Sequence, residues 1–304
     1  MQLTELDMAV LKAVAHYYVL TREMVQAICC AGHASGRGTR KRLLRLGKAG
    51  YVVKHRVPVA LPGTNGAAPV YYATKKGAEA LASYFGSDEF LASNTRTPRA
   101  DRLSHWIAIN EKRLLIEAAV ERVPELDMVQ WVTEWTIVNQ GDAKTDQYYL
   151  HTQFSEKPPL SCSPDAAFVL EFRGQRKVFF VEVDLATSSP RQIAARKSKG
   201  YDRMATTKTH RKLFPATTLD SFRVLFITTN DYRAKKTMAE MNDKPGKEHW
   251  LMMSETTLNP DNFFTGDVAL DHEGITGPLV KNVTASAVQI DQPNRPHVAP
   301  PASV

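Results

Sequence analysis

Two apolar, strand-forming segments in the second half of the chain, joined by a short polar link, constrain the fold most strongly. Residues 166–172 (AAFVLEF) and 178–183 (VFFVEV) are separated by the sequence Arg-Gly-Gln-Arg-Lys. Runs of this length that are rich in β-branched and aromatic residues, with a glycine-containing turn between them, are typical of a β-hairpin. We therefore expect two adjacent antiparallel strands, the second of them buried.

Helices and strands alternate around this hairpin. An amphipathic helical periodicity comes first, and a segment rich in Val, Trp, Thr and Ile follows it. A polar insertion that runs to residue 160 precedes the hairpin. We expect an α+β or α/β core of order αβββαβ, extended by a further helix and strand, with helices at 103–123, 191–204 and 233–241 and strands at 128–138, 166–172, 178–183, 222–229 and 250–253.

Three carboxylates lie at the ends of the hairpin strands. Asp165 comes directly before the first strand, Glu182 follows the apolar run Val178–Val181, and Asp184 ends the segment. Because adjacent strands of a hairpin bring such positions together, we expect Asp165 and Glu182 to meet. Carboxylate oxygens suit Mg²⁺ or Mn²⁺, and such ions assist phosphodiester hydrolysis by activating water. The ordinary alternatives are a turn former, a solvated strand end and a helix cap.

On Pro164–Asp165 and Glu182-x-Asp184, within the αβββαβ plan, the chain resembles the PD-(D/E)xK nuclease superfamily. The resemblance implies a Mg²⁺- or Mn²⁺-dependent endodeoxyribonuclease whose metal ligands are Asp165, Glu182 and Asp184. The lysine that this superfamily carries two residues after the glutamate is replaced here by Asp184, which leaves catalysis open.

The next helix offers a substitute for that lysine. Lys197 and Tyr201 are four residues apart on one face, where recombination-repair nucleases of the superfamily carry a Gln-x-x-x-Tyr element. The resemblance implies catalytic roles for Tyr201 and for Lys197 or Lys199. The first helix of the core adds three weaker candidates. His105 is interpreted as a cap or packing residue, and Glu111 and Glu117 are candidates for extra metal contacts.

The excess positive charge of the chain is concentrated at its N-terminus. The chain has a net charge of +7, and residues 1–60 contain 10 Lys or Arg against 3 Asp or Glu, so the remainder is balanced. A compact basic segment is typical of polyanion binding, and a solvated face kept soluble by Lys and Arg is the ordinary alternative.

The spacing of residues within this basic region predicts a winged helix-turn-helix unit. Apolar periodicity indicates a helix at 6–19 with Thr4 as its N-cap, and Thr21 caps a second, short helix. The basic helix at 35–48 follows, with an apolar stripe of Leu43, Leu44 and Leu46 expected to be buried. Strands at 51–61 and 70–74 around the turn at 62–69 form the wing, and a helix at 75–84, with Ala78, Leu81 and Tyr84 on its inner side, closes the unit.

In such units the third helix enters the major groove of DNA, and the wing touches the backbone or the minor groove. The residues expected in the groove are Arg37, Thr39 and Arg40. The residues expected on phosphates and adjoining surfaces are Arg42, Arg45, Lys54 and Arg56. Docking of an acidic protein partner is the alternative for this surface.

The whole arrangement, a winged helix followed by the PD, EVD and K-x-x-x-Y elements, resembles the replication-relaxation family over residues 4–255. This implies a DNA-binding protein of a plasmid or mobile element that acts in replication or mobilisation and carries a nuclease-like domain. The other interpretation is a non-catalytic regulator or accessory factor whose degenerate core mediates dimerisation or partner docking. The expected division is a winged-helix domain at 1–92, a linker at 93–101, a nuclease-like domain at 102–258 and an extension with a proline-rich disordered tail at 259–304.

Other classes of protein lack support in the sequence. Three cysteines give no disulfide framework or zinc pattern, and there is no Walker-type glycine loop and no apolar run long enough to cross a membrane. We therefore expect a cytoplasmic protein without a membrane partner. The partners considered are double-stranded DNA, a second copy of the chain, and replication or mobilisation proteins.

Overall fold

The computed structural model describes residues 2–32, 35–56, 69–139 and 147–281. Its N-terminal part is a helical unit with a small antiparallel sheet of strand order β1-β3-β2. The expected turn at 62–69 lies almost entirely outside the described residues. The elements in chain order are α1 (Glu5–Tyr17), β1 (Leu20–Thr21), α2 (Arg22–Cys29), α3 (Arg37–Lys48), β2 (Val52–His55), β3 (Val70–Ala73), α4 (Lys75–Phe85) and the 3₁₀ helix η1 (Asp88–Ala92).

Local chemistry explains where these helices begin. Thr4 and Thr21 cap α1 and α2 as expected, since each side chain accepts a hydrogen bond from the backbone amide of the third residue of its helix. In each of two helices, one residue that was expected to be buried is exposed. Leu44 of α3 and Tyr84 of α4 are 58% and 54% exposed, because Leu43 and Leu81 already fill the inward direction of those helices.

The second part of the chain is built on one mixed sheet. Among the described residues its strand order is β14-β13-β12-β11-β10-β9-β4, with β4, β9 and β10 antiparallel and β10, β11 and β12 parallel. The expected hairpin is therefore confirmed as β9 and β10. The strands of the sheet are β4 (Leu126–Thr133), β9 (Ala166–Phe172), β10 (Gln175–Asp184), β11 (Phe222–Thr228), β12 (Trp250–Ser254), β13 (Ala269–Leu270) and β14 (Thr276–Gly277).

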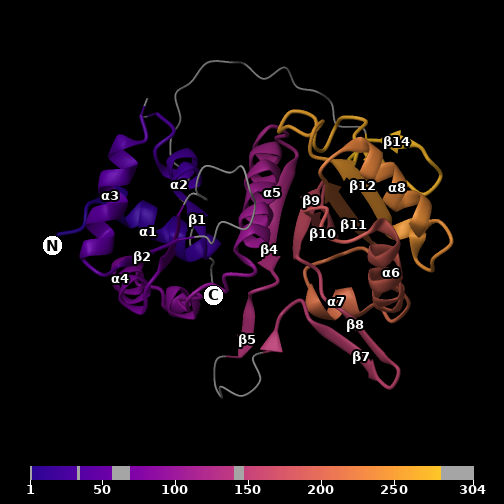
Figure 1. Ribbon diagram of the computed structural model, residues 1–304, viewed down its shortest axis with the longest axis horizontal. Coiled ribbons are helices and arrows are strands. Elements are labelled where there is room, and N and C mark those ends of the chain that lie inside the picture. The colour runs from indigo at the N-terminus through magenta and orange to yellow at the C-terminus, as the bar shows by residue number, and fades with distance from the viewer. Residues whose placement is uncertain (1, 33–34, 57–68, 140–146, 282–304) are drawn as a thin grey trace.

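Helices cover both faces of this sheet. One face packs on α5 (Leu103–Glu121), and the other packs on α6 (Pro190–Thr206), α7 (Thr209–Leu213) and α8 (Asp231–Met241). Figure 1 shows α5 and β4 between the N-terminal unit and the rest of the sheet, with α6 and α8 on the far side. Tyr18 and Val19 of the N-terminal unit join the apolar cluster beneath α5, so the two parts share a core. The fold is mixed α+β.

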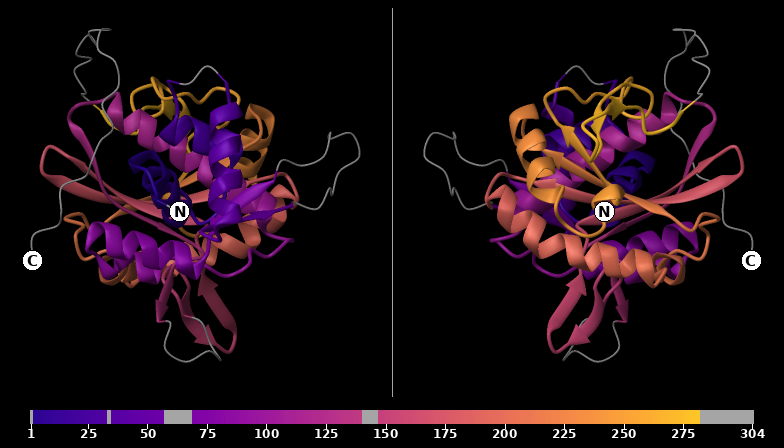
Figure 2. Two further views of the ribbon diagram at one scale, coloured as in Figure 1. Left: turned by 90° about the vertical axis from the view of Figure 1, so that its left-hand side faces the viewer. Right: turned by 90° about the vertical axis from the view of Figure 1, so that its right-hand side faces the viewer.

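The segments between the predicted elements contain more structure than the sequence indicated. The single strand expected at 128–138 is β4 followed by β5 (Ile137–Asn139), which belongs to a separate two-stranded sheet with β6 (Gln147–Tyr148). The insertion forms the hairpin of β7 (Thr152–Glu156) and β8 (Pro159–Cys162), which projects from the body in both panels of Figure 2.

Two further parts of the expected organisation can be placed. Residues 93–101 contain no helix or strand. Residues 259–281, expected as an extension, instead add β13 and β14 to the sheet and bury Phe263 and Phe264, whereas the proline-rich end lies outside the described residues. None of the described helices is long and apolar enough to cross a membrane.

Candidate functional site

Three adjacent strands each carry a carboxylate at the same end of the sheet. In the register of the central strands, Ala166 of β9 lies opposite Thr133 of β4 on one side and Val181 of β10 on the other. The next residue along each strand in that direction is Glu134, Asp165 or Glu182. Antiparallel pairing places such positions side by side, so the three acidic side chains line one edge.

Asp165 is held through both its side chain and its backbone. Its Oδ2 accepts a 2.7 Å hydrogen bond from the Val183 amide, its backbone carbonyl accepts one of 2.8 Å from the Glu134 amide, and its side chain is buried. Burial alone would raise the pKa of this carboxyl, but the nearby Lys197 ammonium and the hydrogen bonds from His105 and Val183 hold the pKa well below its usual range. Asp165 is therefore a fixed negative charge.

Glu182 faces α6 and is bonded at both oxygens. Tyr201 donates a 2.6 Å hydrogen bond to Oε1, and the Lys197 ammonium contacts Oε2. Lys197 Nζ also lies 3.8 Å from Asp165 Oδ1, so one cation bridges the two carboxylates. Burial raises the pKa of Glu182 well above its usual range, against the opposing effect of Lys197. The expected meeting of Asp165 and Glu182 is thus found, with Lys197 between them.

The close approach of α6 to β8 of the β7–β8 hairpin helps to place Lys197 and Tyr201 at this site. A Cβ atom on Gly200 would lie 2.5 Å from the Ser161 carbonyl oxygen, so the residue beside Tyr201 must lack a side chain for the helix to sit so near β8. A capping box at Ser189 and Gln192 fixes the start of the helix. The i, i+4 spacing then directs Lys197 and Tyr201 to the same carboxylate.

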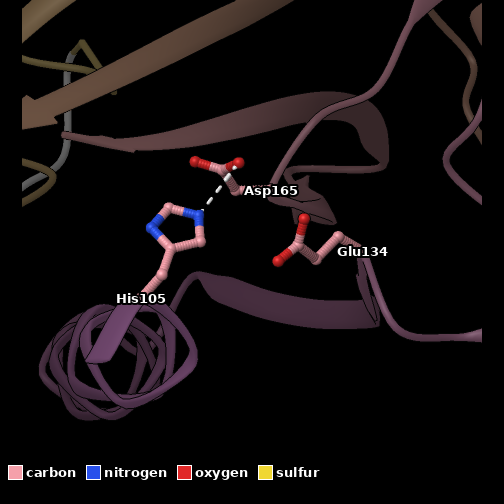
Figure 3. Close-up of side chains that lie close together, drawn as sticks. All are labelled: His105, Glu134 and Asp165. Carbon is pink, nitrogen blue, oxygen red and sulfur yellow. Dashed lines mark ion pairs between the residues drawn. The ribbon is translucent and has the colours of Figure 1, made fainter. Parts of the chain in front are cut away.

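A histidine and a glutamate complete the cluster from the other face of the sheet. His105 of α5 has its Nε2 atom 3.2 Å from Asp165 Oδ1, and Glu134 accepts a 2.6 Å hydrogen bond from Trp106 Nε1. Figure 3 shows His105, Glu134 and Asp165 pointing toward one another, and one ligand atom from each lies within 4.8 Å of the others. Burial favours the neutral ring, but Asp165 raises the pKa of His105 overall. Burial and the Asp165 charge both raise the pKa of Glu134.

Sequence reasoning did not find these two residues as a pair. His105 was interpreted as a cap or packing residue, and Glu134 was not singled out. The strand predicted at 128–138 placed Glu134 inside it, and only the end of β4 at Thr133 shows that Glu134 holds a strand-end position like that of Asp165. Glu111 and Glu117 of the same helix do not join the cluster, since neither belongs to the group of close ligand atoms and Glu117 instead accepts a hydrogen bond from Arg113 Nε.

The structure does not bring Asp184 and Lys199 into this site. Asp184 points toward α8, where it pairs with Arg233 and accepts a 2.6 Å hydrogen bond from Thr228. Lys199 is exposed on α6, two residues from Lys197 and therefore on a different side of the helix. Of the two lysines considered, only Lys197 contacts the carboxylates.

The basic side chains of the N-terminal unit have two kinds of surroundings. Arg42 and Arg45 pair with Asp7, a fully buried residue of α1, and so join α3 to α1. Burial would raise the pKa of Asp7, but its hydrogen bonds with Thr4 and the two arginines lower it to about 2. Thr39 is buried and donates a hydrogen bond to Gln26, so its side chain is not on the outer face. Of the other residues expected to contact DNA, Arg37, Arg40, Lys54 and Arg56 are exposed.

Comparison with known proteins now identifies the family. Residues 11–217, more than half of the chain, match the replication-relaxation model. The chain belongs to the replication-relaxation family. The match spans α1 to the segment after α7 and so includes Asp165, Glu182 and Lys197 of this family member. The resemblance stated from the sequence is confirmed.

Two further comparisons add little to this assignment. No curated protein matches the chain. Among solved structures, the chain is similar to the SdaI restriction endonuclease, with 16% sequence identity, coverage of 83% of this chain and 85% of that chain, and a TM-score of 0.27. A TM-score this low carries no conclusion about the fold.

Proposed function

We propose that this replication-relaxation protein is a DNA-binding protein of a plasmid or mobile element that acts in replication or mobilisation and cleaves DNA with a divalent metal ion. One observation carries the proposal. Three carboxylates from adjacent strands, one histidine and one lysine converge at a single end of the sheet, with Asp165 held by a backbone amide. Clusters of ionisable groups that face one another in this way are frequent at hydrolytic sites.

The N-terminal unit would provide the contact with duplex DNA. Its three helices and antiparallel strands have the order of a winged helix-turn-helix, in which α3 is the groove-binding helix. The outward side of α3 carries Arg37 and Arg40, and the adjacent strand carries Lys54. Positive charges on one face attract the phosphate backbone.

His105, Glu134 and Asp165 are the residues that would hold the metal ion. They offer one imidazole nitrogen and carboxylate oxygens from three separate elements, a donor set that suits Mn²⁺ and other divalent ions with affinity for nitrogen. A divalent ion bound there supplies a Lewis acid that polarises the phosphate and lowers the pKa of water. Asp184, expected as a third ligand, is outside this set because Arg233 pairs with it.

The nuclease superfamily carries a lysine at the position of Asp184, and Lys197 takes over its role in this chain. Its ammonium contacts Glu182 and is 3.8 Å from Asp165, so it carries positive charge to the edge where a phosphate would bind. Glu182 in turn orients this ammonium, and Tyr201 fixes Glu182 through its hydroxyl. This arrangement keeps a cation ready to stabilise negative charge on the scissile phosphate.

The test is incubation of the purified full chain with supercoiled plasmid in Mn²⁺ and in Mg²⁺, beside an EDTA control. We expect nicking in Mn²⁺, and we expect its rate to fall by roughly 100-fold or more in Asp165→Asn. This substitution removes the negative charge that contacts both the proposed metal ion and Lys197. Lys199→Ala, which changes an exposed lysine of the same helix, is the matched control and keeps full activity. Nicking that persists undiminished in Asp165→Asn would exclude this site as its source.

A non-catalytic accessory factor is the second candidate function. It is favoured because both carboxylate oxygens of Glu182 already have a partner within the protein, one in Lys197 and the other in Tyr201. In that case the network stabilises the core, which serves for dimerisation or partner docking. No cleavage in either metal, together with retained DNA binding, would support this second function over the first.

A further inference from the structure

One face of α3 combines positive charge with an exposed leucine at its centre. Arg37, Lys41, Leu44 and Lys48 follow one another at steps of four, three and four residues, which places them on one stripe of the helix. All four side chains are exposed. Figure 1 shows α3 at the edge of the N-terminal unit that lies away from the large sheet. This stripe is therefore open to a ligand.

Leu44 is unusual within this stripe. Its side chain is 58% exposed, whereas Leu43 and Leu46 of the same helix are 1% and 0% exposed and supply the packing against the unit's core. Leu44 borders a shallow hollow that is otherwise lined by Lys41, Arg45, Lys48 and Ala49. A leucine side chain left in water among charged groups gains nothing for folding, and its burial by a ligand would be favourable.

The charge around Leu44 selects the class of ligand. Within the described part of the chain, no carboxylate is paired with Arg37, Lys41 or Lys48, and the buried carboxylate of Asp7 is paired with Arg42 and Arg45. The stripe thus presents uncompensated positive charge that complements a polyanion. An apolar group at the centre of such a surface needs an apolar group on the polyanion, and in the major groove of DNA that group is the C5-methyl of thymine.

We propose that Leu44 is a specificity-determining residue that contacts thymine methyl groups in the major groove, while the flanking Lys41 and Lys48 contact phosphates. This inference rests on the proposed DNA binding by α3. It adds a base preference that charge alone does not provide, since phosphate contacts are the same for every sequence. The preference is for thymine over uracil at the contacted position.

The experiment compares the affinity of the full chain for two alternating polymers, poly(dA-dT) and poly(dA-dU), by fluorescence anisotropy at fixed salt. The two duplexes have the same charge and differ in the C5-methyl groups. We expect the wild-type protein to bind the thymine polymer about three- to tenfold more tightly, as burial of a methyl group against leucine implies. Leu44→Ala should bind both polymers equally, with the affinity for the uracil polymer almost unchanged.

A matched control is Leu91→Ala, which truncates a 48% exposed leucine elsewhere in the N-terminal unit and should keep the thymine preference. Equal affinity of the wild-type protein for both polymers would overturn the role of Leu44 and leave DNA binding intact. An equal loss of affinity for both polymers in Leu44→Ala would also overturn it. If the wild-type protein binds neither polymer even at low salt, the proposed function itself fails.

Discussion

The two charged regions of this protein use charge in opposite ways. On α3, Arg37, Lys41 and Lys48 are exposed, and no described carboxylate pairs with them. At the sheet edge, Lys197 lies between Asp165 and Glu182, and both carboxylates are buried. The first region acts over a distance and is screened by salt, whereas the second depends on short contacts that salt affects little. The difference separates a surface suited to recognition from a site suited to chemistry.

The largest predicted effect on stability is at the buried region. Lys197→Met would leave Asp165 and Glu182 close together without their cation, and we expect a loss of about 3 kcal/mol in the free energy of unfolding. Urea denaturation at pH 7 in EDTA measures it. Adding Asp165→Asn should recover part of the loss, because it removes the buried negative charge that Lys197 balances. If Lys197→Met is as stable as the wild type, the comparison between the two regions breaks down.

A smaller effect is expected at the inner side of α3, where Asp7 is buried between Arg42 and Arg45. Its pKa is lowered from 3.8 to about 2 in the folded protein, so its contribution is present above pH 4 and is lost as the pH falls toward 2. Asp7→Asn should cost about 1–2 kcal/mol at pH 7, with a difference from the wild type that shrinks across this window.

The measurement for Asp7 is urea denaturation of both proteins at several pH values between 2 and 7. Glu79→Gln, a change at an exposed carboxylate of α4, is the control and should leave the curves unchanged. A difference between Asp7→Asn and the wild type that stays constant down to pH 2 would show that the ionised carboxylate contributes nothing.

The smallest effect on stability is expected on the outer side of α3. Lys41→Ala should change the free energy of unfolding by less than about 0.5 kcal/mol, since the side chain is exposed. It should still weaken binding to duplex DNA and reduce the slope of log affinity against log salt by about 1. Lys235→Ala on α8, at the opposite side of the molecule in Figure 1, is the control. An unchanged slope for Lys41→Ala would remove this residue from the interface.

Local patterns predicted the elements and the central carboxylate pair well. The hairpin of β9 and β10 follows from two apolar runs around a turn, and its register brings Asp165 beside Glu182 without any knowledge of the rest of the fold. The caps at Thr4 and Thr21 are similarly local. Such features depend on neighbouring residues alone, and these were present in the sequence.

Features set by distant packing were not predictable in the same way. Glu134 joins the site because β4 pairs with β9 across an insertion, and His105 joins it because α5 covers that face. Asp184 leaves the site because Arg233 approaches from α8. Leu44 was assigned to the wrong side since three leucines lie close together in α3, and only packing decides which two point inward.

The measurement that tests the central claim most directly is a titration of the full chain with Mn²⁺, in which binding is monitored by calorimetry and by tryptophan fluorescence. Trp106 donates its indole N–H to Glu134 and adjoins His105, so a paramagnetic ion at the cluster should quench its emission. We predict saturable binding with quenching that is lost in His105→Ala and retained in Lys199→Ala. Binding of equal strength in His105→Ala, or no binding to the wild-type protein, would contradict a metal site formed by His105, Glu134 and Asp165.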